Sequence, residues 1–279
     1  MIVFETIAET LNFAEATRKK GQTIGFVPTM GALHEGHISL VNRAKQENDV
    51  VVVSIFVNPI QFNNPDDLTK YPRTLVKDLQ MLSSVNCDLV FNPSVEEMYP
   101  EKIEKTYDFG QLATVMEGEF RPGHFNGVAT VVQRLFEITI PHKAYFGEKD
   151  YQQLQIIRAL VRNEKLNVEI VPCPISREAD GLARSSRNER LSPEMRKAAP
   201  YIHMVLEEAR NLARAHQASQ IVNFVKAKFS DHPLLKLEYF TIAESENLQP
   251  VTGMVKPGNY GFIAVFAGDI RLIDNIRLI

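Results

Sequence analysis

Two histidines, His34 and His37, are the first candidates for chemistry in this sequence. They lie at the start of a predicted helix, where backbone N–H groups and the positive end of the helix dipole attract anions. Gly31 and Gly36 remove side chains where the backbone could approach a phosphate. The pair therefore predicts an anion site, and its two imidazoles would face a bound phosphate.

The sequence also allows a purely structural role for each of the two histidines. Taken alone, each imidazole could cap the helix or fill a half-buried space. The pairing, the glycines beside it and the position after a predicted strand favour function. A zinc site would need a third His or Cys nearby in the sequence, and none is present, so we expect no metal on this pair.

Two amide side chains, Asn58 and Gln61, follow a second predicted strand, which Pro59 ends. Uncharged amides suit the hydroxyl and carboxylate oxygens of a small polar substrate. The alternative is an asparagine that stabilises a turn beside an exposed glutamine. The sequence alone does not separate the two interpretations.

A third polar connection, Gly147-Glu148-Lys149-Asp150, follows a later strand. Gly147 permits close approach of a ligand, and Lys149 supplies a point charge for phosphate. Asp150 could cap the next helix or bind a ribose hydroxyl, and the two roles can coexist.

The polar segment Ser176–Asn188 contains Arg184-Ser185-Ser186-Arg187, which places two cations around two hydroxyls. Such a loop can fold over a triphosphate and stabilise the charge that develops as pyrophosphate leaves. A solvated surface loop is the alternative.

The elements that must position these groups alternate between short apolar runs and amphipathic stretches, which is typical of β-α-β units on a parallel sheet. The predicted strands are Thr23–Val27, Val50–Val57, Asp88–Phe91, Ala144–Phe146 and Val168–Val171. The predicted helices between them are His37–Glu47, Pro72–Val85, Phe125–Thr139 and Tyr151–Asn163. The run Val50–Val57 does not alternate, so we expect it in the middle of the sheet. Ligands of such sheets bind beyond the carboxyl ends of the strands, where the polar segments follow.

We therefore predict an α/β fold, with a Rossmann-like parallel-sheet domain over residues 1–175 and a smaller α+β domain over 176–279. The smaller domain would begin with the phosphate-binding loop. Its expected elements are helices at Pro193–Ala215 and Ser219–Phe229, an apolar run at Leu235–Ala243, and a hairpin of Gly261–Ala267 with Ile270–Asn275.

The composition excludes several classes of protein. The 279 residues are 44% hydrophobic and carry 31 basic against 34 acidic side chains, so collagen-like, disordered and strongly basic nucleic-acid-binding proteins are excluded. No apolar run reaches membrane-spanning length and no leader pattern is evident. We expect a cytoplasmic protein that contacts neither membrane nor nucleic acid. Cys87 and Cys173 fit no metal or redox spacing and are expected to be buried.

The motifs together resemble a known family. Pro28–His37 resembles the His-x-Gly-His signature of the nucleotidylyltransferase superfamily, which class I aminoacyl-tRNA synthetases share. Further blocks follow in one order: Phe56–Phe62, Tyr71–Arg73, Arg121–Phe125, Tyr145–Asp150 and Arg177–Leu182. As a set they are similar to the pantothenate synthetase (pantoate–β-alanine ligase) family. The C-terminal part of the sequence also resembles that family in its length and in its general pattern of residues.

The resemblance implies an AMP-forming ligase with ATP as a substrate and Mg²⁺ bound with it. The carboxylate of pantoate would attack the α-phosphate of ATP, giving pantoyl adenylate and pyrophosphate. The amine of β-alanine would then attack the acyl carbon, giving pantothenate and AMP. A homodimer is also implied.

The resemblance also implies roles for individual residues. The catalytic set would be His34, His37, Lys149 and Arg187, with His37 as the proton donor. ATP would be bound by Met30, His34, His37, Gly147, Lys149, Asp150, Ser176, Arg184, Ser185, Ser186 and Arg187. Pantoate and β-alanine would be bound by Met30, Asn58, Gln61 and Gln153.

Three positions depart from the family pattern. Ser176 stands where valine is common and Arg184 where methionine is common. Backbone contacts to adenine would tolerate both changes, whereas apolar packing on adenine would not. Lys77-Asp78 offers one carboxylate where some members have two, so we assign no protein ligand to the magnesium ion.

Two other classes of function remain as alternatives. Another nucleotidylyltransferase would need a second nucleotide or phosphate site, for which the amide-rich loop Asn58–Gln61 is poorly suited. A non-catalytic adenine-nucleotide sensor would need no second group of phosphate-binding residues. The combination of His34, His37 and Lys149 with the later Ser-Arg segment argues against a sensor.

Overall fold

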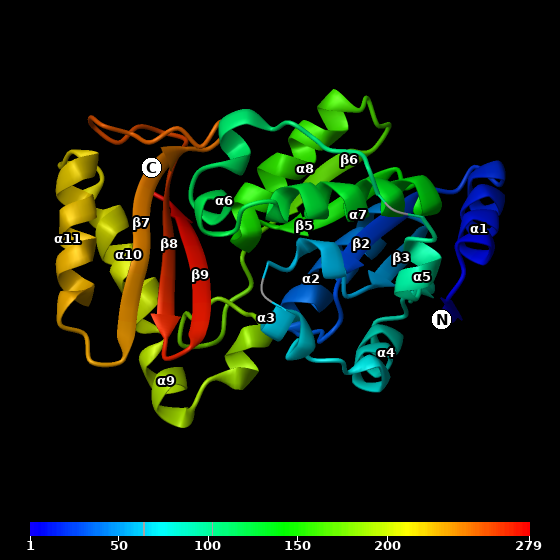
Figure 1. Ribbon diagram of the computed structural model, residues 1–279, viewed down its shortest axis with the longest axis horizontal. Helices are drawn as coiled ribbons and strands as arrows, with labels where there is room; N and C mark the ends of the chain where they lie inside the picture. The colour runs from blue at the N-terminus through cyan, green and yellow to red at the C-terminus, as the bar shows by residue number, and fades with distance from the viewer. Residues whose placement is uncertain (64, 102) are drawn as a thin grey trace. The chain divides into compact units, whose positions relative to one another are not determined.

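A six-stranded parallel sheet, in the order β1-β4-β3-β2-β5-β6, forms the centre of the first part of the chain (Figure 1). Its strands are β1 (Ile2–Phe4), β2 (Ile24–Thr29), β3 (Val50–Ile55), β4 (Leu89–Phe91), β5 (Lys143–Gly147) and β6 (Glu169–Cys173). This is the predicted α/β sheet, and β3 lies inside it as expected. Strand β1 was not expected, because three residues at an edge show no periodicity.

Helices cover both faces of this sheet because the strand side chains alternate between two apolar clusters. The helices of this part are α1 (Ile7–Lys19), α2 (Glu35–Glu47), α3 (Pro65–Thr69), α4 (Leu75–Ser84), α5 (Val95–Met98), α6 (Glu117–Phe120), α7 (His124–Thr139) and α8 (Tyr151–Asn163). Val50 and Val52 of β3 pack with α1, α7 and α8, whereas Val51 and Val53 pack with α2 and α4. This explains the unbroken run of valines in β3. Short 3-10 turns add η1 (Pro59–Gln61), η2 (Gly110–Ala113) and η3 (Glu148–Asp150).

The computed structural model describes residues 1–63, 65–101 and 103–279, and the chain divides into two units. The first unit comprises Met1–Glu148 and Gln152–Pro174. The second comprises Lys149–Tyr151 and Ile175–Ile279. The short segment Lys149–Tyr151 thus groups with the C-terminal residues, although its neighbours in sequence belong to the first unit.

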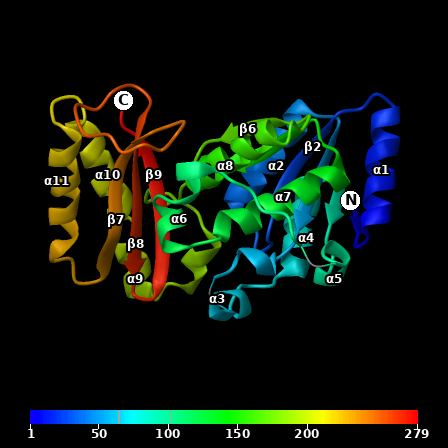
Figure 2. The same ribbon diagram turned by 45° about the horizontal axis from the view of Figure 1, so that its top comes forward.

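A three-stranded antiparallel sheet of β7 (Leu235–Glu244), β8 (Asn259–Ala267) and β9 (Ile270–Arg277) forms the second unit. Helices α10 (Tyr201–Leu212) and α11 (Ala218–Ser230) lie on one side of it (Figure 2) and share its apolar core. The expected hairpin is β8 and β9. The expected helix Pro193–Ala215 is divided into α9 (Pro193–Ala198) and α10, because Pro200 has no N–H to continue the first helix.

None of the helices in the described residues is both long and apolar enough to cross a membrane. Both cysteines are free and buried, as expected. Burial raises the pKa of Cys87 to about 12 and that of Cys173 to about 11. Both therefore stay as thiols at neutral pH, in the form that is a poor nucleophile.

Candidate active site

The loop between β2 and α2 is held by a buried carboxylate. Gly31 and Ala32 have φ values of 79° and 49°, and this left-handed turn directs successive backbone N–H groups to one side. The N–H groups of Ala32 and Leu33 donate to the two oxygens of Asp78 at 3.0 and 2.8 Å. Asp78 is 1% exposed and also accepts from the Thr74 hydroxyl. This positioning role was not predicted from the sequence, where its one signal is an acid within the amphipathic helix α4.

His34 and His37 lie side by side at the N-terminus of α2, with ring centroids 4.1 Å apart and the ring planes tilted by 38°. Nδ1 of His34 accepts from the Gly36 N–H, and Nδ1 of His37 accepts from the His34 N–H. The capping alternative is therefore correct for His34. It is also compatible with phosphate binding, because a neutral imidazole that accepts at Nδ1 carries its hydrogen on Nε2. The pair supplies two ring N–H donors from one end of a helix.

Asn58 and Gln61 are buried next to each other, with 1% and 8% of their surface exposed. Asn58 Nδ2 donates to Gln61 Oε1 at 3.1 Å and to the Gly127 carbonyl at 3.1 Å. The Tyr99 hydroxyl donates to Asn58 Oδ1 at 2.9 Å, and Gln61 Nε2 lies 3.2 Å from the Met30 sulfur. Asn58 makes no side-chain cap to η1. The alternative of a turn asparagine beside an exposed glutamine is therefore wrong.

The start of α7 packs closely on the segment that carries Asn58 and Gln61. The buried His124 ring lies 2.8 Å from the Gln61 carbonyl through Nδ1, which must carry the hydrogen because a carbonyl only accepts. A Cβ on Gly127 would lie 2.5 Å from the Ile60 carbonyl, so only glycine fits there. No pattern in the sequence indicates this contact, because it joins residues 63 positions apart.

Adjacent glutamines on α8 have different surroundings. The buried Gln152 donates to the carbonyls of Leu112 and Val115 and accepts from the Glu117 N–H, so it holds that loop. Gln153, the predicted substrate ligand, is half-buried.

Gly147 ends β5, and a Cβ there would meet no atom within 4 Å. Protein packing therefore does not require glycine at that position.

In the second unit, Lys149 and Asp150 form an ion pair of 3.0 Å, with side chains 18% and 46% exposed. Asn275 on β9 donates from Nδ2 to the Lys149 carbonyl at 3.0 Å. The Tyr151 ring packs against that of Tyr260 in a tilted arrangement, with ring centroids 4.7 Å apart. These contacts explain why this short segment groups with the C-terminal residues.

The predicted phosphate loop begins as a small hairpin. Arg177 pairs with Ala183, and the Arg184 N–H donates to the Ser176 carbonyl at 2.9 Å. The Arg184 guanidinium lies 3.4 Å from a Glu178 oxygen. Arg177 makes a bidentate pair with the buried Asp274, at 2.7 and 3.0 Å, which fixes the hairpin to β9.

The 3-10 turn η4 (Ser186–Arg190) follows the hairpin. Ser185 caps it, because its Oγ accepts from the Arg187 N–H at 3.3 Å. That bond does not use the serine hydroxyl hydrogen, which can still donate to an anion. Ser185, Ser186 and Arg187 are all half-buried.

The structure thus brings the predicted residues together in groups within each unit. In the first unit, His34 contacts His37, and Met30 contacts Gln61, which contacts Asn58. In the second, Lys149 contacts Asp150, and Ser176 pairs with Arg184. Within the described residues, no three His, Cys, Asp or Glu side chains are grouped so as to hold a metal ion.

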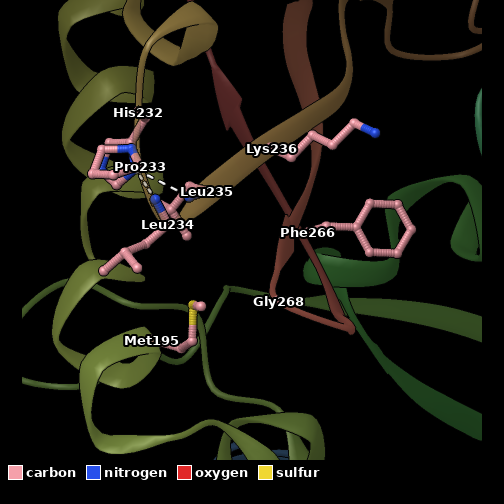
Figure 3. A pocket seen from close by; sticks show the side chains of 8 residues that line it. All are labelled: Met195, His232, Pro233, Leu234, Leu235, Lys236, Phe266 and Gly268. Atoms are coloured by element: carbon pink, nitrogen blue, oxygen red, sulfur yellow. Dashed lines mark hydrogen bonds between the residues drawn. The ribbon is translucent and has the colours of Figure 1, made fainter.

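A separate pocket of about 450 Å³ in the second unit contains none of the predicted residues (Figure 3). It is lined by Met195, His232, Pro233, Leu234, Leu235, Lys236, Phe266 and Gly268. The lining is largely apolar, and His232 Nδ1 already accepts from the backbone N–H groups of Leu234 and Leu235. This pocket therefore presents few convergent polar groups for a polar substrate.

Comparison with known proteins identifies the family. Residues 2–277 match the family model of pantoate-beta-alanine ligase. A pantothenate synthetase from Christiangramia forsetii is 53% identical, over 100% of this chain and 99% of the relative. The crystal structure of pantothenate synthetase from Thermus thermophilus superposes with a TM-score of 0.93 and 44% identity, covering 100% of this chain and 99% of that one. A pantoate-beta-alanine ligase from Francisella tularensis, complexed with beta-gamma ATP and beta-alanine, gives a TM-score of 0.83 at 40% identity, over 100% of this chain and 98% of that chain. The chain belongs to the pantoate-beta-alanine ligase family.

Proposed function

We propose that this protein joins pantoate to β-alanine with ATP, through a pantoyl-adenylate intermediate, and releases pyrophosphate and AMP. The observation that carries the proposal is the His34 and His37 pair at the start of a helix, where both Nδ1 atoms accept backbone N–H groups and each neutral ring therefore carries its hydrogen on Nε2. Family membership supports the reaction, as does the ATP and β-alanine complex of the Francisella relative.

In the first step, the pantoate carboxylate attacks the α-phosphorus and the bond to pyrophosphate breaks. No proton transfer is required, so catalysis depends on stabilising negative charge on the phosphates. We assign His34 and His37 as donors to the transferring group. Lys149, Arg187 and the hydroxyls of Ser185 and Ser186 would neutralise the leaving pyrophosphate.

In the second step, the neutral amine of β-alanine attacks the acyl carbon, the bond to AMP breaks and AMP leaves, and the new amide nitrogen loses its extra proton to water. Because His37 accepts at Nδ1 in its resting position, its Nε2 carries a hydrogen and suits donation to the departing phosphate oxygen. Asn58 and Gln61 would hold the pantoyl group while the amine approaches, with Met30 and Gln153 beside it.

The nucleoside would be held mainly by backbone and small groups. Gly147 has open space where a side chain would be, and with Asp150 it would bind the ribose. The Arg184 N–H is already bonded to the Ser176 carbonyl, so adenine recognition falls to the opposite atoms, the Ser176 N–H and the Arg184 carbonyl. Such backbone contacts suit the unusual side chains at both positions.

Magnesium belongs to this scheme as part of the ATP substrate, held by phosphate oxygens and water. The Asp78 carboxylate does not fit a metal ligand, because each of its oxygens already accepts a backbone N–H.

The direct test measures products from ATP. We expect pyrophosphate release only when pantoate is present, and AMP with pantothenate after β-alanine is added. Pyrophosphate formed with other acceptors in place of pantoate would favour another nucleotidylyltransferase. ATP binding without turnover would favour a nucleotide sensor.

We further propose a cytoplasmic homodimer. Two free buried thiols fit a reducing compartment. Light scattering during size exclusion would measure the mass in solution, and a monomer would contradict the dimer.

A further inference from the structure

We propose that Tyr99 is a positioning residue of this enzyme, because its hydroxyl, acting through Asn58, holds the Gln61 amide with its NH₂ group directed to substrate. Gln61 then acts only as a donor, to an acceptor oxygen of the hydroxy acid. The inference rests on the proposed function, since that function supplies the hydroxy acid.

The orientation of both amides follows from one unambiguous acceptor. The Gly127 carbonyl can only accept, so the Asn58 atom 3.1 Å from it must be Nδ2. The same Nδ2 faces Gln61 at 3.1 Å, so the Gln61 atom there must be Oε1. The remaining amide group of Gln61, Nε2, must therefore point the other way, toward Met30.

Tyr99 supplies the hydrogen bond that the last polar atom of Asn58 needs. With Nδ2 facing Gly127 and Gln61, Asn58 Oδ1 needs a donor, and the Tyr99 hydroxyl supplies it at 2.9 Å. Burial raises the pKa of Tyr99, which keeps that hydrogen in place at neutral pH. The ring is held at the end of α5 and lies edge-on to Phe56, with centroids 5.9 Å apart. Tyr99 is thus a fixed donor to an asparagine that is 1% exposed.

At the opposite end of this series of hydrogen bonds, the Gln61 Nε2 group has only a weak partner without substrate. Gln61 Nε2 lies 3.2 Å from the Met30 sulfur, and a thioether is a weak acceptor. A carboxylate or hydroxyl oxygen is a stronger partner for this N–H group. The geometry therefore favours an acceptor oxygen at Gln61 over an ammonium or amide N–H.

The test is Tyr99→Phe, which removes one hydroxyl and keeps the ring. We expect the KM for pantoate to rise about three- to tenfold, with the KM for ATP unchanged, because one buried hydrogen bond is lost. In a Gln61→Ala background, Tyr99→Phe should cause no further change, since the residue through which it acts is gone. Equal effects in both backgrounds, or no rise in the pantoate KM, would overturn the proposal.

Two companion variants complete the experiment. Tyr107→Phe is the matched control, because Tyr107 also donates from a part-buried hydroxyl, but to Gln133, and its variant should keep the normal pantoate KM. Gln61→Glu keeps the size of the side chain and replaces the outward NH₂ by an oxygen. It should raise the pantoate KM more than Tyr99→Phe does, whereas a normal KM would overturn the donor role. Wild-type protein that fails to convert pantoate would refute the proposed function itself.

Discussion

The candidate site residues of the two units are held in different ways. In the first unit, the side chains themselves are fixed: Asn58 and Gln61 are buried, and both polar atoms of Asn58 and the Gln61 Oε1 atom have directed partners. In the second unit, the backbone is fixed while charged side chains remain partly exposed, as at Lys149, whose carbonyl binds Asn275.

The difference follows from what each group would recognise. A neutral amide distinguishes one oxygen from another only when its direction is set and water is excluded. A lysine or arginine binds phosphate mainly through charge, which tolerates small changes in position. Substitutions in the first unit should therefore alter which hydroxy acid the enzyme accepts and how fast that acid is activated. Substitutions in the second should alter the response to ATP and to salt.

The largest effect is expected from His37→Ala. Removing a donor from the transferring phosphate should lower the rate of pyrophosphate release about 10²–10³-fold. Rapid-quench measurement of a single turnover with ATP and pantoate checks this. His216→Ala, which removes an imidazole bound to the Leu212 carbonyl, is the control and should stay near wild type. A near-normal rate for His37→Ala would remove His37 from the mechanism.

Lys149→Ala should have an effect of similar or somewhat smaller size, about 10²-fold on kcat/KM for ATP. Its loss should also weaken the dependence of that constant on ionic strength, because a charge-to-charge contact is removed. Steady-state kinetics at several salt concentrations measure both. The exposed Lys236, changed to alanine, serves as the control; an unchanged salt dependence in Lys149→Ala would contradict the charge role.

Asp78→Asn should have an intermediate effect on both stability and rate. An amide presents one NH₂ group to the backbone N–H groups of Ala32 and Leu33, so one donor loses its acceptor. We expect a loss of about 1–3 kcal/mol in the free energy of unfolding, measured in urea, together with slower adenylation. Exposed Asp231→Asn should change neither. Unchanged stability of the Asp78 variant would show that the loop does not depend on this clamp.

The smallest effect concerns acid stability, away from the site. Arg43, followed by Lys143, lowers the pKa of Glu47 to about 2 by hydrogen bonding. Since the folded pKa lies below the ordinary 4.5, the stabilisation is present above pH 4.5 and is lost as the pH falls toward 2. In thermal unfolding between these limits, Glu47→Gln should show a weaker loss of Tm than the wild type. Parallel curves for the two proteins would refute the contribution.

The sequence by itself determined the elements and the local groups of residues. Unbroken valines predicted a central strand, and the apolar spacing of Tyr151–Asn163 predicted α8 with its observed bounds. His34 and His37 could be paired because three residues span less than one helical turn. The catalytic and binding roles of the site residues stay predictions.

Only the tertiary structure decided what positions these groups. Tyr99 binds an asparagine 41 residues away, Asp78 clamps a loop 46 residues away, and Asn275 holds Lys149 across 126 residues. Such bonds join side chains to distant partners at irregular separations. They leave no periodic pattern in the sequence, because periodicity reports which face of an element is buried and not which polar atom lies opposite.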